Sequence, residues 1–382
     1  MSACDPCLRR ALLVALLAAR IAGLLDRPSS RVAGLLALSE EELVAAACGT
    51  SGAAARRAAV LDALDARDLD HDRKRFANAG VAAVCRHDEA YPPLLHALGD
   101  APAVLFVMGR LETLATLRAE PAVAIVGTRR PSPYGREVAH VLGRGLGASG
   151  VPVVSGLALG IDATAHRGCL DGGGLPVAVL AGGPDVVYPR RHLGLHRAVR
   201  EAGIVVSELP PGARPFRWSF PARNRIMAGL TQMTVVVEAA DPSGSLITSD
   251  FARDLGRSVA AVPGHVTSRM ARGANGLLRD GAVPITGPED VLDELFGAGM
   301  RRVPPAGSAA PPEPADPVLR RVLDAAERER SVAAIAAQAR VTTAQARSAL
   351  GRLETDGYIV RRDLAGWERS LDSAAPPYSG GP

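Results

Sequence analysis

The sequence predicts an α/β protein in which a parallel sheet is preceded by a small helical region and followed by a further helical module. Between residues 121 and 297, short apolar runs alternate regularly with helix-period segments, which is typical of a parallel sheet covered by helices on both faces. Residues 1–70 are rich in Ala and Leu at helical spacing and have no strand pattern. The 382 residues are enough for two or three domains with full hydrophobic cores.

Charge is unevenly distributed, and nearly all of the basic charge is arginine, since Lys74 is the only lysine. Residues 121–230 carry 13 arginines against 6 acids, a net charge of +7. Residues 231–297 carry 5 arginines against 9 acids, a net charge of −4. Because the planar guanidinium group binds phosphate oxygens in pairs, the first of these regions is a candidate polyanion-binding face. Ordinary solvated arginines are the alternative interpretation.

The cysteines indicate a reducing, cytoplasmic compartment. They are odd in number and scattered (Cys4, Cys7, Cys48, Cys85 and Cys169), which argues against a disulfide framework. Cys4 and Cys7 form a C-x-x-C pair, but we find no second Cys or His pair at zinc spacing, so we expect neither a metal nor a cofactor. The apolar run 11–19 is expected to form a buried helix rather than a signal peptide, and no stretch is long enough to cross a bilayer.

A helical domain is expected over residues 1–70. Ser39, followed by three glutamates, has the pattern of a helix N-cap with acids in the first turn. The domain resembles a degenerate SAM or helix–hairpin–helix module, but it lacks the paired glycines with which such modules grip duplex DNA. We therefore expect it to contact protein or to be purely structural.

The main domain is expected over residues 71–297, and its first part, 71–120, is a bridge with strands at 81–85 and 103–108. The parallel strands are expected at 123–126, 152–155, 176–180, 204–207, 233–238, 259–262 and 283–286. Several of these strands end in glycine or serine. Because open α/β sheets bind ligands beyond the carboxyl ends of their strands, these ends predict one long crevice.

The first loop of this crevice contains Gly127, Thr128 and Arg129 and leads into a helix expected to begin at Tyr134. A strand that breaks on glycine and leads into a helix N-terminus offers backbone N–H groups to an anion. Arg129 and Arg130 add positive charge. The loop matches neither a Walker A loop nor G-x-G-x-x-G, so no standard nucleotide-binding motif applies. We interpret it as a corner that grips a phosphate, with single-stranded DNA as the expected source of that phosphate.

Three further segments are candidates for ligand contact, and one of them, the loop 241–248, repeats this design with small residues, hydroxyls and backbone amides before a helix. Ser155 and Gly156 begin a glycine turn that leads to Asp162, expected to cap a helix, and to His166, expected to pack rather than to catalyse. Phe220 stands beside Arg223 and Arg225, and with aromatic residues at only 3% of the chain this composition favours a base-stacking platform next to phosphate contacts. The complete set of residues expected to contact DNA is Gly127, Thr128, Arg129, Ser155, Gly156, Arg190, Arg191, Phe220, Arg223, Asn224, Arg225, Ser243, Gly244, Ser245 and Asn275.

The C-terminal part is expected to hold a linker, a small domain and a tail. Residues 298–317 are a Pro/Ala linker, and residues 371–382 are expected to be disordered. Residues 318–370 read as three helices, one capped by Ser331 and the next by Thr342 or Thr343, followed by a hairpin, which together indicate a winged helix. Winged helices bind duplex DNA or protein, and both alternatives stay open.

The order and spacing of the motifs resemble those of the DNA-processing protein A family over residues 75–297. The motifs are AIVGTRRPSPYG, SGLALGIDATAHRG, VYPRRH, FPARNRIMAGL, VVEAADPSGSLIT, AVPGHVTS and RGANGLLRDGA. This resemblance implies an extended Rossmann-like domain that binds single-stranded DNA, forms homodimers and loads a RecA-type recombinase during natural transformation, without enzymatic activity. A single-strand-binding protein is a further expected partner. The DNA contacts that the resemblance implies fall on Arg129, Arg190, Arg191 and the segment 220–224.

Two other functions remain as alternatives. A nucleoside-monophosphate phosphoribohydrolase would use the same kind of sheet, with Glu238 as the carboxylate near the glycosidic bond. A transcription factor would place most of its DNA affinity in residues 318–370. The first loop makes an NAD-dependent dehydrogenase a weaker alternative than either.

Overall fold

The computed structural model describes residues 3–25, 32–49, 53–303, 314, 316–326, 328–329, 331–356, 358–361 and 367–369. The chain divides into two compact units, Met1–Arg302 and Val303–Pro382. Most of the expected linker and the whole expected tail at 371–382 lie outside the described residues.

A nine-stranded sheet is the centre of the first unit, in the order β1-β2-β6-β5-β4-β3-β7-β8-β9. The strands are β1 Val81–Cys85, β2 Val104–Gly109, β3 Val123–Val126, β4 Val153–Ser155, β5 Pro176–Val179, β6 Ile204–Ser207, β7 Met233–Val236, β8 Ser258–Ala261 and β9 Val283–Pro284. Strands β3 to β9 pair in parallel, and β2 is antiparallel to both of its neighbours. All nine strands lie where the sequence predicts them, with bounds that differ by at most two residues.

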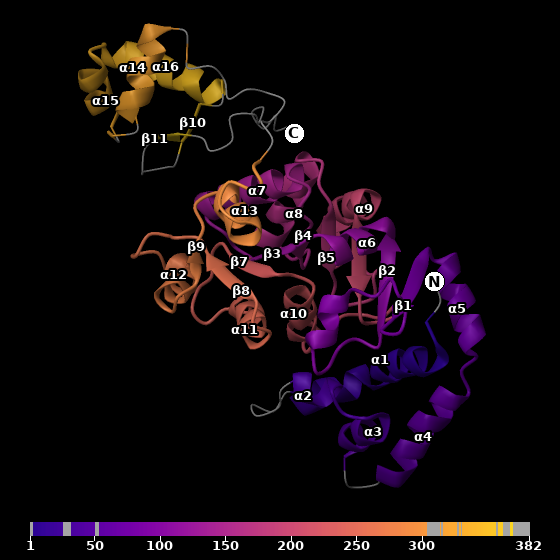
Figure 1. The fold of residues 1–382 in the computed structure, drawn as a ribbon. Coiled ribbons are helices and arrows are strands. Elements are labelled where there is room, and N and C mark those ends of the chain that lie inside the picture. The colour runs from indigo at the N-terminus through magenta and orange to yellow at the C-terminus, as the bar shows by residue number, and fades with distance from the viewer. Residues whose placement is uncertain are drawn as a thin grey trace. The chain divides into compact units, whose positions relative to one another are not determined.

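Helices cover both faces of the sheet (Figure 1). One face carries α7 Pro133–Ala148, α8 Ile161–Asp171, α9 Leu193–Ala202 and α13 Pro288–Phe296; the other carries α10 Ser219–Gly229, α11 Leu246–Asp254 and α12 Arg272–Arg279. A further helix, α6 Glu112–Ala119, follows β2. The central strands are therefore buried on both sides, which explains why they read as continuous apolar runs rather than as alternating ones.

Glycine allows α7 and α8 to pack with their backbones in close approach. A Cβ atom at Gly143 would overlap the carbonyl oxygen of Ala165, and one at Gly168 would overlap that of His140. The glycine-rich stretches of the sequence at these positions thus serve helix packing rather than ligand binding.

The N-terminal helices share their hydrophobic core with the β1–β2 end of the sheet. They are α1 Asp5–Leu25, α2 Val32–Leu36, α3 Glu40–Cys48, α4 Ala53–Asp65 and α5 Leu69–Asn78. Leu8 and Phe76 lie in one buried cluster with Phe106 of β2 and Trp218, and the indole Nε1 of Trp218 donates to the carbonyl of Ala18 at 2.9 Å. The expected N-cap at Ser39 is present and forms a capping box with Glu42. Among the described helices, not even the 21-residue α1 is long and apolar enough to cross a membrane.

The second unit contains α14 Pro317–Ala326, α15 Val332–Ala339, α16 Thr343–Thr355 and the antiparallel pair β10 Ile359–Arg361 and β11 Trp367–Arg369. Ser331 and Thr342 are the N-caps of α15 and α16, as the sequence predicts. Leu323, Ile335, Leu350 and Leu353 form the centre of its small core.

Candidate functional site

A cleft of about 620 Å³ lies beyond the carboxyl ends of β3 and β7. From β3 the chain continues to β4 on one side, whereas β7 continues to β8 on the other side, so these two neighbouring strands form the switch point of the sheet. The loops that follow them diverge at such a point and leave a crevice, which is where open α/β sheets bind their ligands. The cleft is lined by the loop after β3, the loop after β7 and the first turns of α10 and α11.

Arg129 and Arg130 supply exposed positive charge to the cleft. The guanidinium carbon of Arg129 lies 5.5 Å from the ring centre of Phe220, and that of Arg223 lies 5.7 Å from the same ring. Tyr188 packs against Phe220 with 5.7 Å between ring centres. Phe220 is therefore a half-buried aromatic surface between two guanidinium groups.

The N-terminus of α7 is already neutralised by a carboxylate of the chain itself. Glu238, just after β7, accepts hydrogen bonds from the backbone N–H of Ser132 at 2.9 Å and from its hydroxyl at 2.6 Å. The hydroxyl oxygen of Ser132 also accepts from the N–H of Gly135. The structure thus corrects the expectation that this helix N-terminus grips a phosphate, because an internal carboxylate takes that place.

The second glycine loop is closed in a similar way. The buried carboxylate of Asp162 accepts from the backbone N–H groups of Gly156 and Ala158 at 3.1 and 3.4 Å. Burial raises the pKa of Asp162, while Arg223, whose Nη2 lies 3.8 Å away, opposes that shift. Asp162 therefore ties this loop to Arg223, and the expectation that it caps the helix is wrong, because the N-cap of α8 is Gly160 and Asp162 lies within the first turn.

Ser155 and Gly156 do not reach the cleft, contrary to expectation. Ser155 is fully buried, and its hydroxyl donates to the carbonyl of Ile125 at 2.6 Å. The carbonyl of Gly156 accepts from Arg223, whose guanidinium group also donates to the carbonyl of Val179 at 3.0 Å. Both residues are part of the support beneath the cleft.

The loop Ser243–Ser245 forms the opposite wall of the cleft. Asn224 of α10 donates to the carbonyl of Gly244 at 3.1 Å, and the hydroxyls of Ser243 and Ser245 lie 2.8 Å apart. Unlike α7, the helix α11 that follows has no side-chain cap among the described residues. Two of its first-turn amides are nevertheless engaged, because the N–H of Leu246 donates to the carbonyl of Ser243 at 3.2 Å and that of Thr248 donates to the carbonyl of Ser245 at 3.1 Å. The N–H of Ile247 has no acceptor among the described residues and remains for an incoming anion.

Arg225 lies on the other side of α10 and cannot serve the cleft. It is fully buried, its Nε lies 2.8 Å from Asp100, and its Nη2 donates to both oxygens of Glu208 at 2.8 and 2.9 Å. Burial raises the pKa of both Asp100 and Glu208, and the charge of Arg225 opposes this rise. The expected DNA contact at Arg225 is thus replaced by a buried ion-pair network that stabilises the fold.

Three further residues expected at the site lie outside the cleft. Arg190 and Arg191 are exposed on a short 3-10 segment, Arg190–His192, close in sequence to Tyr188. The side chain of Asn275 donates to the carbonyl of Gly264 at 2.9 Å and accepts from its N–H at 3.1 Å, so it braces a neighbouring loop.

The cleft brings together nine of the fifteen expected residues: Gly127, Thr128, Arg129, Phe220, Arg223, Asn224, Ser243, Gly244 and Ser245. It adds apolar and hydroxyl groups that were not among the expected DNA contacts, including Met227, Ile247, Thr248 and Met270. The order of the strands in the sheet, rather than a local sequence pattern, brings these side chains to the cleft.

Glu238 is poorly suited to the hydrolase alternative. Both of its oxygens are engaged by Ser132, and Glu238 is not among the residues that line the cleft. His166 is fully buried, as expected of a packing residue, and burial lowers its pKa to about 3.

Residues 82–296, more than half of the chain, match the family model of the DNA recombination-mediator protein A. The chain is 41% identical over 243 residues to a putative DNA processing protein DprA of Mycobacterium tuberculosis, a match that covers 59% of this chain and 61% of that relative. It is also 41% identical over 232 residues to DNA processing protein DprA of Streptococcus pneumoniae, which covers 61% of this chain and 79% of that one. The X-ray structure of DprA from S. pneumoniae is similar with a TM-score of 0.60 at 32% identity, covering 77% of this chain and 99% of that one.

Proposed function

Because the chain belongs to the DNA recombination-mediator protein A family, we propose that it binds single-stranded DNA in the cleft beyond β3 and β7 and acts in DNA processing. The observation that carries this proposal is the pair of exposed arginines at one wall of a cleft whose other wall is a serine–glycine loop. This combination of guanidinium groups and hydroxyls is suited to a phosphate backbone.

The phosphate contacts are assigned first to Arg129 and Arg130. Neither has an ion-pair partner among the described residues, so their charge remains available to a ligand. The loop Ser243–Ser245 and the uncapped start of α11 face them across the cleft and can hold a further phosphate oxygen. Successive phosphates of one strand would then be neutralised from both walls.

We assign the preference for single-stranded over duplex DNA to Phe220. An unpaired base has a free face that can stack on an aromatic ring, whereas the bases of a duplex are already stacked on one another. Phe220 is half-buried and backed by Tyr188, so its ring is held in place before a base arrives. Base stacking of this kind does not read sequence.

The test is the affinity for fluorescently labelled oligo-dT, measured by anisotropy at two or more salt concentrations. We expect Arg129→Ala to weaken binding by roughly tenfold to a hundredfold, since a hydrogen bond to a charged group contributes about 1.5–3 kcal/mol. Loss of one phosphate contact should also reduce the salt slope by about 0.7. Arg118→Ala, which removes an arginine of α6 outside the cleft, serves as the matched control.

An unchanged affinity and an unchanged salt slope in Arg129→Ala would contradict the proposed mechanism. An equal loss in Arg118→Ala would show that binding depends on overall charge rather than on the cleft.

We also propose that the bound strand is not chemically altered. Among the residues that the structure describes, Asp162 is the one carboxylate that lines the cleft, and it is buried and hydrogen bonded to two backbone amides. Incubation with AMP or CMP should therefore release no free base, a result that chromatography can check. Release of base that is lost in Glu238→Gln would establish the hydrolase instead.

The remaining parts of the proposal rest on the family. They are a cytoplasmic homodimer that loads a RecA-type recombinase onto incoming strands during natural transformation, together with a single-strand-binding protein. The match spans 61% of the length of the M. tuberculosis relative. The oligomeric state and these partners therefore need to be tested with this chain. Light scattering would give the oligomeric state, and a strand-exchange assay with and without the protein would measure loading.

The second unit is proposed to be a winged helix formed by α14, α15, α16 and the β10–β11 pair. The outward residues Gln345, Ser348 and Arg352 of α16 would face its partner, which is duplex DNA or protein. Deleting residues 318–370 should leave most of the affinity for single strands. If most of the affinity is lost instead, the winged helix is the main DNA-binding module.

A further inference from the structure

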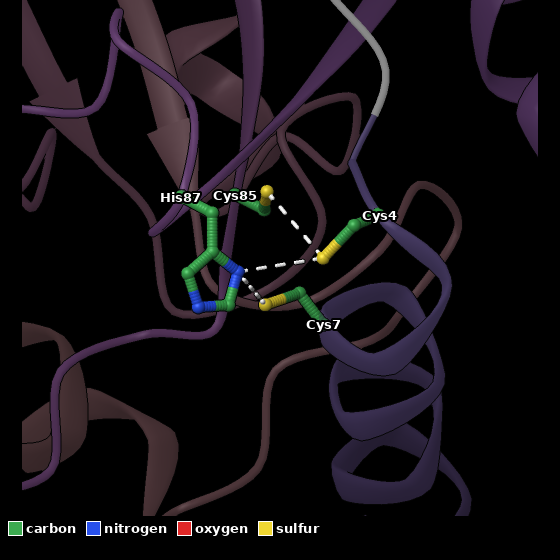
Figure 2. Close-up of side chains that lie close together, drawn as sticks. All are labelled: Cys4, Cys7, Cys85 and His87. Carbon is green, nitrogen blue, oxygen red and sulfur yellow. Dashed lines mark hydrogen bonds between the residues drawn. The ribbon is translucent and has the colours of Figure 1, made fainter.

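Cys4, Cys7, Cys85 and His87 converge at the edge of the sheet, far from the cleft (Figure 2). Cys4 and Cys7 lie at the start of α1, whereas Cys85 ends β1 and His87 follows it. All four ligand atoms, three Sγ and one imidazole nitrogen, lie within 4.8 Å of one another. The expectation that Cys4 and Cys7 lack a second pair is thus wrong, because Cys85-x-His87 provides it.

The distances between these atoms fit a tetrahedral metal site. The Nδ1 atom of His87 lies 3.4 Å from the Sγ atoms of both Cys4 and Cys7, and the Sγ atoms of Cys4 and Cys85 are 3.9 Å apart. With Zn–S at about 2.3 Å and Zn–N at about 2.0–2.1 Å, a tetrahedron has S–S edges of about 3.8 Å and S–N edges of about 3.5 Å. These three separations match the edges of a zinc tetrahedron, and the remaining pairs of ligand atoms lie within 4.8 Å of one another, so small side-chain movements complete the site.

We propose that these four residues bind a structural zinc ion as a Cys3His site. Three thiolates and one imidazole complete the tetrahedral coordination, so no position is left for water, as is typical of structural rather than catalytic zinc. Soft sulfur ligands favour zinc over magnesium or calcium. The site goes beyond the proposed DNA binding and does not depend on it.

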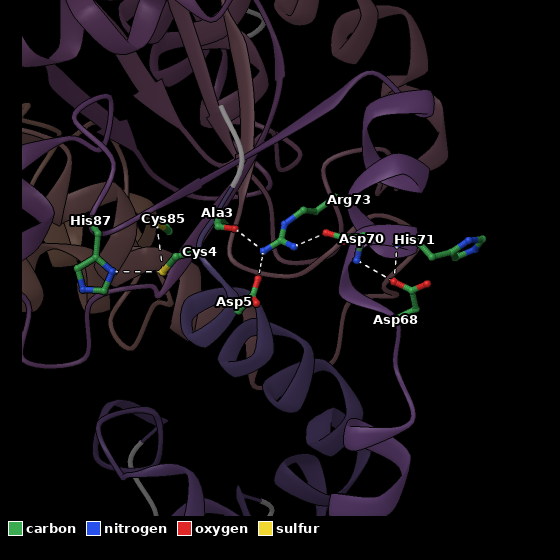
Figure 3. Close-up of polar contacts among 9 residues, drawn as sticks. All are labelled: Ala3, Cys4, Asp5, Asp68, Asp70, His71, Arg73, Cys85 and His87. Carbon is green, nitrogen blue, oxygen red and sulfur yellow. Dashed lines mark hydrogen bonds and ion pairs between the residues drawn. The ribbon is translucent and has the colours of Figure 1, made fainter.

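Neighbouring groups hold the ligands in place (Figure 3). Arg73 of α5 donates to the carbonyl of Ala3 at 2.8 Å, pairs with Asp5, and donates to Asp70 at 2.8 Å, which fixes the segment that carries Cys4. On the other side, the N–H of Asp88 donates to the carbonyl of Cys85 at 2.8 Å, and the N–H of Arg86 donates to the carbonyl of Ala103 at 3.1 Å, which fixes the segment that carries Cys85 and His87. Such contacts orient the ligands of metal sites.

The zinc would join two segments about 80 residues apart in sequence, the start of α1 and the end of β1. Because the site forms only in the folded chain, the binding free energy of the metal contributes to folding. It would thus fasten the N-terminal helices to the β1–β2 end of the sheet.

The test begins with full-length protein purified under reducing conditions without chelator. We expect about one zinc ion per chain by elemental analysis, as for other four-ligand sites. Cys7→Ser and His87→Ala should each lose most of the metal. Cys48→Ser, which changes a buried cysteine of the same helical layer outside the cluster, should retain it.

Cobalt gives a second measurement that needs no variant. Adding Co²⁺ to the metal-free, reduced wild-type protein should produce the visible absorption of tetrahedral cobalt and a thiolate charge-transfer band, both abolished by an excess of Zn²⁺. Wild-type protein that contains no zinc and gives no such spectrum would overturn the proposal. A Cys4–Cys85 disulfide found by thiol titration of freshly purified protein, or equal metal in Cys7→Ser and wild type, would also overturn it.

Discussion

The two arginines of the loop after β3 and the two arginines of α10 illustrate opposite uses of the same side chain. Arg129 and Arg130 are exposed at the cleft and have no ion-pair partner among the described residues. Arg223 and Arg225 are buried, and each is matched by carboxylates within the chain. The first pair has charge available for a ligand, whereas the charge of the second pair is already compensated inside the protein.

This difference shows why basic composition is a weak guide to a binding surface. A buried guanidinium group needs partners for its charge and its donors, and once they are supplied it supports the fold rather than a ligand. Of the four arginines, Arg129 and Arg130 remain the ones expected to respond to DNA and to salt.

The largest effect is expected from Arg225→Met. The variant leaves Asp100 and Glu208 buried without their counter-charge, which costs about 3–5 kcal/mol of unfolding free energy. Chemical denaturation followed by circular dichroism measures this loss. Removing the two acids as well, in Arg225→Met/Asp100→Asn/Glu208→Gln, should restore most of the stability, because no unpaired charge is then left inside.

If Arg225→Met lowers the unfolding free energy by less than about 1 kcal/mol, the ion pairs of Arg225 with Asp100 and Glu208 contribute no more than exposed ion pairs do. Arg225 would then not differ from Arg129 in its contribution to the fold.

A smaller effect, on DNA affinity, is expected at the aromatic ring of Phe220, which lies near Arg129 and Arg223. Phe220→Ala should weaken oligo-dT binding by about 1–3 kcal/mol, since one base loses its stacking surface, whereas Phe220→Trp should bind at least as well as wild type. The salt slope should stay unchanged in both variants, because no phosphate contact is removed. Equal binding by Phe220→Ala and wild type would mean that no base stacks on this ring.

The most gradual effect concerns pH and the buried layer beneath Arg223. Burial lowers the pKa of His166 to about 3, whereas an unfolded histidine titrates near 6.5. The unfolded chain therefore binds the proton first as pH falls, so stability is fully present above about 6.5 and is lost between about 6.5 and 3. The slope from this one group is at most about 1.4 kcal/mol per pH unit.

In His166→Gln this part of the acid destabilisation should be absent when unfolding is measured from pH 7 to pH 4. His71→Gln, which changes an exposed histidine of α5, is the control. Identical pH profiles of His166→Gln and wild type would mean that the pKa of His166 is the same in the folded and the unfolded chain, which would contradict the shift.

Much of the fold could be predicted from the sequence because its signals are local. Continuous apolar runs marked the strands, and hydroxyl caps such as Ser39 and Thr342 marked helix starts. The strand order could not be predicted in this way. That β2 enters the sheet antiparallel, beside β6, depends on contacts between segments about 100 residues apart.

In the candidate site, too, local features could be predicted from the sequence, whereas contacts between distant segments could not. Loops rich in glycine and serine were found by pattern, but their partners come from elsewhere in the chain. Nothing near Ser132 in sequence indicates that Glu238 occupies the start of α7, and nothing near Cys4 points to Cys85. A search that paired C-x-x-C with any distant C-x-H would have found the cysteine cluster.

The single lysine, Lys74, lies exposed on α5, in the N-terminal helical layer and outside the cleft. Amine-reactive dyes therefore have one side-chain target on this protein, besides the N-terminal amine. A fluorophore or a surface tether attached there leaves every arginine of the cleft unmodified. Because the basic residues that line the cleft are arginines and the chain has a single lysine, amine-reactive labelling does not modify the cleft.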